Sequence, residues 1–271
     1  MLWIAYQLRE QWKNVLFYSP EMDANEVEQR LHLIHTNFNS KEFFQGQLTA
    51  EQFVEWREKN QSLKKTLREK RWWEIVIIDD IELADFNLTT IKARMNRLDT
   101  QLRWVYVKSF PDKKESYEKQ KHFFDCIIVD GFHLLNWSDL KKNASEWKES
   151  QLVSQGLRSF ARIEKVPVLV SLHTNRDKQK AEEKIIPDAR DTSMTASLWR
   201  DLTCLLSLFS TKYLAEKWKI WMSCTLSRRS SKWKVWTFDF NPEEWRIKPN
   251  QKVQTQAEFE EDVNKESLGW E

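Results

Sequence analysis

Four short apolar runs, separated by stretches long enough for helices, constrain the fold of this chain most strongly. The runs occupy residues 14–19, 74–80, 125–130 and 166–173. The stretches between them place apolar residues at helical spacing, as Val27, Leu31 and Ile34 do. Strands that alternate with helices pair in parallel. We therefore predict an α/β fold with a mostly parallel central sheet flanked by helices.

The last part of the chain has a different pattern. Three strand-like runs follow one another at residues 202–209, 217–227 and 232–240, and the last two alternate between apolar and polar positions. This order predicts an antiparallel C-terminal edge to the sheet. From residue 249 onward the chain is polar and acidic. We therefore expect a core domain over residues 1–248 and a disordered tail over residues 249–271.

The composition suits a soluble globular protein. Apolar residues make up 41% and charged residues 31% of the chain, and no run approaches the roughly 18 apolar residues of a membrane span. The net charge of +2 gives no general preference for nucleic acid. Cys126, Cys204 and Cys224 lie in apolar runs without the spacing of zinc ligands. We expect buried free thiols, no signal peptide and a cytoplasmic location.

Polar residues follow the predicted parallel strands where each strand ends. Asp79 and Asp80 end one run, Asp130 and His173 end two others, and Glu21 lies just beyond the first. Functional groups of open α/β sheets gather at these strand ends. An acid there can hold Mg²⁺, and a glutamate can activate a water molecule. The alternative is that the acids begin turns or cap helices and that His173 has no role.

Several stretches are similar, in their order along the chain, to the segments of one known family. They read NVLFYSPEMDANEVEQRL, GQLTAEQFVEW, IVIIDDIELADFNLTTIKARMNRL, DCIIVDGFHLL, VSQGLRSFARIEKVPVLVSLHTNR, IIPDARDTSMTASLWRDLTCLLSL and LSRRSSKWKVWTFDFNPEEWRI. Over residues 1 to about 247 the chain resembles the C-terminal ATPase domain of DnaB-type replicative helicases. The resemblance implies a RecA-like core that uses ATP and Mg²⁺ to unwind DNA during replication.

The resemblance also implies roles for single residues. Glu21 would be the general base, Asp130 the Mg²⁺ ligand, and His173 the sensor of the γ-phosphate. Arg229, with Arg228 beside it, falls where the family places an arginine that reaches the nucleotide of the neighbouring subunit. An exposed basic hairpin turn is the alternative for both arginines.

Two loops are the candidate contacts with DNA. They follow the predicted strands that end at Asp130 and His173, and the family holds DNA with the loops at these two places. Here the loops span residues 136–150 and 174–194. The basic residues that could contact phosphates are Lys141, Lys142, Arg176, Lys178 and Lys180. Both loops are close to neutral overall, so solvated surface loops are the alternative. The implied partners are single-stranded DNA, other copies of the chain in a hexamer, and a primase or helicase loader. The implied setting is a bacterial or phage-infected cell.

The sequence departs from the family at the phosphate-binding loop. Its glycines are Gly46, Gly131, Gly156 and Gly269, and none belongs to a G-x-x-x-x-G-K-[ST] pattern. Without the backbone amides and the lysine of that loop, we do not expect ATP binding by the usual route. The chain would then be a truncated or inactive helicase core. Two other interpretations stay open, a non-catalytic scaffold that binds DNA or a helicase partner, and a relative of RecA-type recombinases or loaders.

Overall fold

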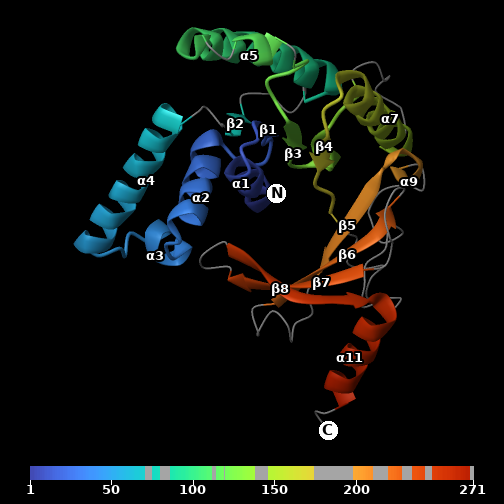
Figure 1. Ribbon diagram of the computed structural model, residues 1–271. Coiled ribbons are helices and arrows are strands. Elements are labelled where there is room, and N and C mark those ends of the chain that lie inside the picture. Colours follow the sequence, from blue (N-terminus) through green and yellow to red (C-terminus); the bar gives the residue numbers. More distant parts are fainter. Residues whose placement is uncertain are drawn as a thin grey trace. The chain divides into compact units, whose positions relative to one another are not determined.

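The computed structural model consists of two compact units, Met1–Leu172 and His173–Glu271. Each unit contains one four-stranded sheet (Figure 1). The structure describes residues 1–70, 75–79, 86–111, 114–118, 120–137, 146–173, 198–209, 219–227, 234–241 and 246–268.

The sheet of the first unit is parallel throughout. Its strands are β1 (Val15–Tyr18), β2 (Ile75–Ile78), β3 (Cys126–Val129) and β4 (Val168–Val170), in the spatial order β2-β1-β3-β4. All three neighbouring pairs are parallel. Each strand lies within a run predicted from the sequence, so the predicted parallel α/β sheet is confirmed. Because parallel strands all end at the same edge, the residues that follow β1, β3 and β4 are neighbours.

Helices connect the strands and begin at residues that cap them. They are α1 (Leu2–Glu10), α2 (Ala24–Thr36), α3 (Ser40–Phe44), α4 (Ala50–Lys70), α5 (Leu88–Ser109), α6 (Lys114–Glu118), the short 3₁₀ helix η3 (Phe132–Leu134) and α7 (Glu146–Glu164). Asp23 accepts the amide of Glu26 at 2.8 Å, and the amide of Gln52 donates to Thr49 at 3.2 Å. These two contacts cap the starts of α2 and α4. Among the described helices, none combines the length and the apolar character of a membrane span.

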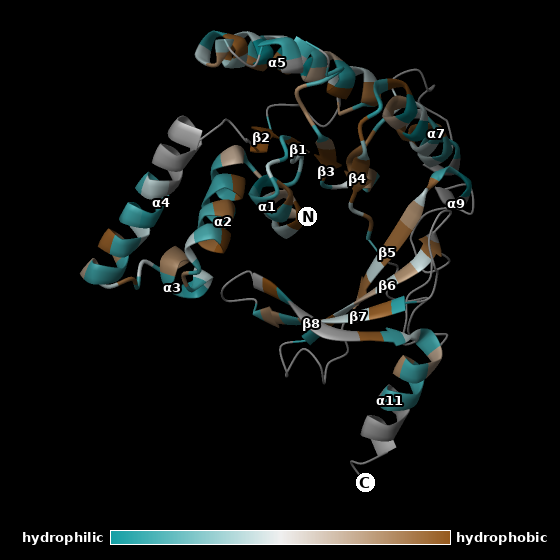
Figure 2. Cartoon of the chain, viewed as in Figure 1, coloured by the Kyte–Doolittle hydropathy of each residue, from teal (hydrophilic) through white to brown (hydrophobic). Residues whose placement is uncertain are grey.

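The core of the first unit is centred on β1 and β3. Every residue of these two strands is buried, and Figure 2 shows β3 and β4 in the brown of apolar residues. Helix α5 contributes the buried side chains of Ile91 and Met95. The hydroxyl of Tyr18 donates to the backbone oxygen of Ile91 at 2.7 Å, which satisfies a polar atom inside this core. The central strands and the helix packed on them therefore form a fixed base for the strand ends.

The second unit holds the three antiparallel strands that the sequence predicted and a fourth that it did not predict. Strands β5 (Cys204–Phe209), β6 (Lys219–Ser227), β7 (Lys234–Asn241) and β8 (Arg246–Thr255) pair in sequence order. Each neighbouring pair is antiparallel. The short helix α9 (Leu198–Asp201) precedes them, and helix α11 (Gln256–Leu268) follows them.

The expected disordered tail differs from what the structure shows. Residues 246–268 form β8 and α11. The ring of Phe259 on α11 is 2% exposed and packs edge-on against Trp221, with ring centroids 4.4 Å apart. One buried aromatic therefore orders a helix whose other residues are mostly polar, and average composition did not indicate it.

The cysteines also differ in part from the expectation. Cys126 and Cys224 are buried, but Cys204 is exposed, so the prediction of buried thiols is wrong at this position. Burial in β3 raises the pKa of the Cys126 thiol to about 12. The sulfurs of Cys204 and Cys224 lie 3.7 Å apart on neighbouring strands. An apolar run alone does not show which side of a strand faces solvent.

Candidate nucleotide site at the strand ends

Asp130 follows β3 and is held from two neighbouring strands. Its backbone amide donates to the oxygen of Tyr18 at 2.9 Å, which continues the pairing with β1. The hydroxyl of Ser171, just after β4, donates to Asp130 Oδ1 at 2.8 Å. The same hydroxyl oxygen accepts the amide of Gly131 at 2.7 Å. The carboxylate is therefore fixed at the edge of the sheet by backbone and side-chain contacts.

Gly131 turns the chain away from the sheet directly after Asp130. Its φ angle is +114°, in the left-handed region that favours glycine. A Cβ at this position would lie 3.1 Å from Leu134 Cδ1 and 3.4 Å from Glu21 Oε1. The turn thus brings the segment after β3 against Glu21, which comes from the end of β1.

Glu21 sits in a turn that follows β1. The hydroxyl of Ser19 donates to the backbone oxygen of Met22 at 2.8 Å and closes this turn. Glu21 Oε1 lies 3.3 Å from His133 Nε2, and each of the two side chains is 38% exposed. The structure therefore places the predicted base and the turn after Asp130 beside each other, with the glutamate open to solvent.

His173, the predicted sensor, is the first residue of the second unit and directly follows Leu172. Its role at the strand ends stays a prediction. His133 was not among the residues predicted from the sequence. A histidine three positions after a strand-end acid was the only signal, and it pointed to no particular role.

The second strand-end acid has a structural role. The amide of Ala24 donates to Asp79 Oδ2 at 2.5 Å, so Asp79 helps to cap the start of α2. Asp80 lies outside the described residues. The helix-capping interpretation therefore holds for Asp79, although its sequence context closely resembles that of Asp130.

The charge of Asp130 also acts on the amino group of Met1, which precedes α1. Burial lowers the pKa of this amino group, and the negative charge of Asp130 acts in the opposite direction.

The remaining predicted site residues cannot be placed beside these. Arg228, Arg229, Lys141, Lys142, Arg176, Lys178 and Lys180 lie outside the described residues. Their roles in nucleotide and DNA binding stay predictions.

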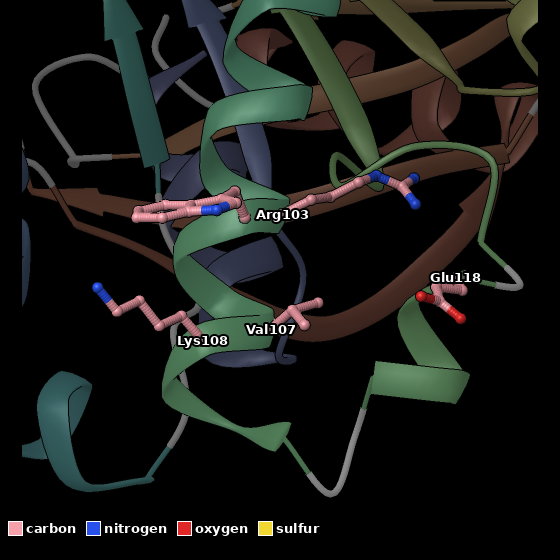
Figure 3. Close-up of a pocket in the computed structure, with 5 residues that line it drawn as sticks. Arg103, Val107, Lys108 and Glu118 are labelled. Carbon is pink, nitrogen blue, oxygen red and sulfur yellow. The ribbon is translucent and has the colours of Figure 1, made fainter.

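A separate hollow of about 370 Å³ lies along α5 (Figure 3). Its lining residues are Arg103, Trp104, Val107, Lys108 and Glu118, from α5 and α6. Arg103 is already paired with Asp99 at 2.9 Å, and Lys108 Nζ lies 4.9 Å from the centre of the Trp104 ring. None of the strand-end residues lines this hollow, so it is not part of the candidate nucleotide site.

Comparisons with known proteins agree with this architecture. The family described as the DnaB-like helicase C terminal domain matches residues 1–217. A solved structure described as an ATPase domain is similar, with a TM-score of 0.67 and 16% identity over 92% of this chain and 79% of that chain. A DnaB-like replicative helicase, solved in a study of its interactions with primase, gives a TM-score of 0.63 and 16% identity over 90% of this chain. A comparison with curated proteins found no match.

The parallel sheet and the antiparallel sheet agree with the fold of these two solved structures. Because the family match covers residues 1–217 of 271, the chain belongs to the DnaB-like helicase C-terminal domain family. The chain spans 52% of the DnaB-like replicative helicase, about half of its length.

Proposed function

We propose that this chain is the ATPase core of a DnaB-like replicative helicase and takes part in ATP-dependent unwinding of DNA. The arrangement of Asp130, Ser171 and Glu21 at one sheet edge carries this proposal. The carboxylate of Asp130 is oriented by the Ser171 hydroxyl at 2.8 Å. Glu21 lies against the turn at Gly131. A fixed acid beside a solvent-accessible glutamate suits hydrolysis of a phosphoanhydride bond, such as that of the terminal phosphate of ATP, by water.

The residues present fit a magnesium ion at Asp130. Mg²⁺ prefers carboxylate and hydroxyl oxygens, and Asp130 and Ser171 offer these atoms at the end of two adjacent strands. A bound magnesium ion would supply positive charge next to the phosphates. Asp130 would hold the ion, and the Ser171 hydroxyl would keep the carboxylate in position.

The other residues have separate tasks in this proposal. Glu21 would orient a water molecule and accept its proton. His173 would contact the terminal phosphate, and Arg229 with Arg228 would reach a nucleotide on a neighbouring copy of the chain. Single-stranded DNA, a homo-hexamer, and a primase or loader are the proposed partners, in the cytoplasm of a bacterial or phage-infected cell. Lys141, Lys142, Arg176, Lys178 and Lys180 would contact the DNA phosphates.

Although Asp130 suits a magnesium ion, this chain does not provide the usual binding loop for the phosphates of ATP. The sequence contains no G-x-x-x-x-G-K-[ST] pattern, so it lacks the backbone cradle and the lysine of a phosphate loop. We therefore expect the chain by itself to bind ATP weakly and not to hydrolyse it.

Isothermal calorimetry with Mg-ATP tests the proposal in two proteins. The first is the chain itself, and the second carries a strand and a G-x-x-x-x-G-K-T loop fused before Met1. We expect the fusion to bind and hydrolyse ATP, and the chain alone to bind ATP weakly without hydrolysing it. In the fusion, Glu21→Gln should retain ATP binding and lower turnover by at least about 100-fold, the usual effect of losing a general base.

Asp79→Asn is the matched control in the fusion, because Asp79 also follows a parallel strand but caps α2. It should leave turnover within about twofold, since a weakened cap affects stability more than chemistry. A folded fusion without ATPase activity would contradict the proposed function. Tight, magnesium-dependent ATP binding by the chain alone would contradict the requirement for a phosphate loop.

The second candidate function is a non-catalytic helicase-like scaffold, and the absence of a phosphate-loop pattern from the sequence favours it. A scaffold would bind single-stranded DNA or an active helicase, and the fused loop would not confer turnover. Measuring DNA binding by fluorescence anisotropy alongside the ATPase assay separates the two candidates.

A further inference from the structure

Two cysteines of the second unit lie on neighbouring strands with their sulfur atoms close together. Cys204 begins β5 and Cys224 lies in β6, and the two Sγ atoms are 3.7 Å apart. We propose that this pair is a redox modification site, which a small disulfide such as oxidised glutathione converts from two thiols into one intrachain disulfide. This inference goes beyond the ATPase proposal and does not depend on it, because both cysteines lie within the second unit, away from Asp130 and Glu21 in the sequence.

An irregularity in the pairing of β5 with β6 accompanies this approach of the sulfurs. Leu205 pairs with Leu226 of β6. The next residue, Leu206, pairs with Cys224, so the register shifts by one residue, as in a β-bulge. Cys204 and Leu206 are alternate positions of β5 and both are exposed, so they lie on the same side of the strand. Cys204 is therefore a diagonal neighbour of Cys224, and bulges re-aim side chains at such places.

Only a small movement separates the two thiols from a disulfide. Bonded sulfur atoms lie about 2.05 Å apart, so these sulfurs must approach by less than about 2 Å. Cys204 is exposed and begins β5, which is the first strand in the order β5-β6-β7-β8. Rotation of its side chain at this edge position can supply the movement without a change in the strand order.

The different exposure of the two thiols sets the order of the reaction. Cys204 is exposed, whereas Cys224 is buried. The Cys204 thiolate attacks one sulfur of oxidised glutathione, and one glutathione thiolate leaves. The Cys224 thiolate then attacks the Cys204 sulfur of this mixed disulfide, and the second glutathione leaves. The two protein thiols lose two electrons and two protons, and one oxidised glutathione becomes two reduced glutathione molecules.

The third cysteine provides a contrast within the same chain. Cys126 is buried in β3 of the first unit, and burial raises the pKa of its thiol to about 12. Burial and the contact with Cys224 raise the pKa of the Cys204 thiol to about 11. Because only a thiolate attacks a disulfide, oxidation of the pair should be slow at neutral pH and is best measured in mildly alkaline buffer.

Incubation of the full chain with oxidised glutathione at about pH 8.5, followed by tryptic digestion without a reductant, tests this site. Trypsin releases Cys204 in the peptide 201–212 and Cys224 in the peptide 220–228. We expect mass spectrometry to find these two peptides joined. The free thiols, counted after unfolding, should fall from three to one, and dithiothreitol should restore all three.

Cys126→Ala is the matched control and should form the same joined peptides. Cys224→Ser should stop at the mixed disulfide of Cys204 with glutathione, and Cys204→Ser should leave the buried Cys224 unmodified. Circular dichroism should show that all three variants are folded. In the Cys126→Ala chain, oxidation should shift unfolding to higher urea concentration, because a disulfide restricts the unfolded chain.

Three results would overturn the proposal. The first is a folded chain that keeps all its thiols under conditions that oxidise the urea-unfolded chain. The second is a disulfide that joins Cys126 to either of the other cysteines. The third is a disulfide that joins two copies of the chain through Cys204 in place of the intrachain link.

Discussion

Two clusters in the first unit combine glutamate with histidine, and their surroundings give them different properties. In the first, Glu21 and His133 are each 38% exposed at the strand ends. In the second, the carboxylate of Glu164 is buried at the end of α7 and contacts three cationic or basic groups. Its partners are Lys92 at 2.9 Å, Lys121 at 2.9 Å and His122 at 3.1 Å.

The two clusters differ in the groups that contact their carboxylates, because lysine side chains contact Glu164. Hydrogen bonds from Lys92 and Lys121 lower the pKa of the Glu164 carboxyl to about 2. Through these contacts the Glu164 carboxylate links α7 to α5 and to the segment at residues 121–122. In the exposed cluster, Glu21 contacts the imidazole of His133, and both side chains are open to solvent. A carboxylate at an accessible position can exchange its contacts for a ligand, whereas a buried carboxylate paired with lysines stabilises the fold.

Glu164→Ala should have the largest effect on stability. We expect a loss of about 2 kcal/mol in the free energy of unfolding, less than for a fully buried pair because the side chains of Lys92 and Lys121 are 47% exposed. Glu21→Ala, the matched change in the exposed cluster, should cost less than about 0.5 kcal/mol. Urea unfolding at pH 7 measures both, and equal losses would remove the proposed difference between the clusters.

The contribution of Glu164 should depend on pH in a defined direction. Its pKa is lowered from 4.5 to about 2 in the folded chain. The stability that it contributes is therefore fully present above pH 4.5 and is lost as the pH falls toward 2. The difference in unfolding free energy between the unmodified chain and Glu164→Gln should narrow between these values. Urea unfolding at a series of pH values from neutral down to this range tests it, and a constant difference would contradict the assigned cause.

His122→Ala should have a smaller effect than removal of Glu164. The His122 side chain is 9% exposed, and it contacts Glu164 through Nε2. We expect a loss of about 1–2 kcal/mol from the missing hydrogen bond and packing. His133→Ala should change stability by less than about 0.5 kcal/mol, because His133 lies in the exposed cluster. Thermal unfolding of both variants compares the two histidines. A greater loss of stability for His133→Ala than for His122→Ala would contradict the structural role given to the cluster around Glu164.

Ser171→Ala should produce a smaller change in stability than Glu164→Ala or His122→Ala. It removes the hydroxyl that donates to Asp130 and accepts from Gly131. A loss of about 1 kcal/mol or less is expected, since one hydroxyl is removed at a partly solvated position. In the phosphate-loop fusion, the same change should weaken magnesium-dependent ATP binding. Unchanged binding would show that Ser171 does not position Asp130 for the ion.

The sequence predicted the strands of the first sheet closely, because their signals are local. The run at residues 125–130 contains β3 (Cys126–Val129), and the run at residues 14–19 contains β1 (Val15–Tyr18). The cap at Asp23 is equally local, because its side chain accepts an amide only three residues away. Helix α11 was missed, because its order depends on the contact of Phe259 with Trp221, on a different strand.

The candidate site was predictable only in part. Glu21, Asp130 and His173 could be proposed because parallel strands end at a common edge. The sequence did not separate Asp79 from Asp130, although the first caps α2 and the second accepts the Ser171 hydroxyl. Which neighbour an acid meets depends on strand order, and sequence order does not give it.

By itself, the sequence determined the elements, the parallel sheet and the kinds of residue that follow each strand. Apolar periodicity and capping act over a few residues, so they can be read along the chain. The tertiary structure alone decided that His133 faces Glu21 and that Glu164 collects Lys92 and Lys121. Those contacts join residues far apart in the sequence, and they exist because the order β2-β1-β3-β4 brings distant strand ends and helices together.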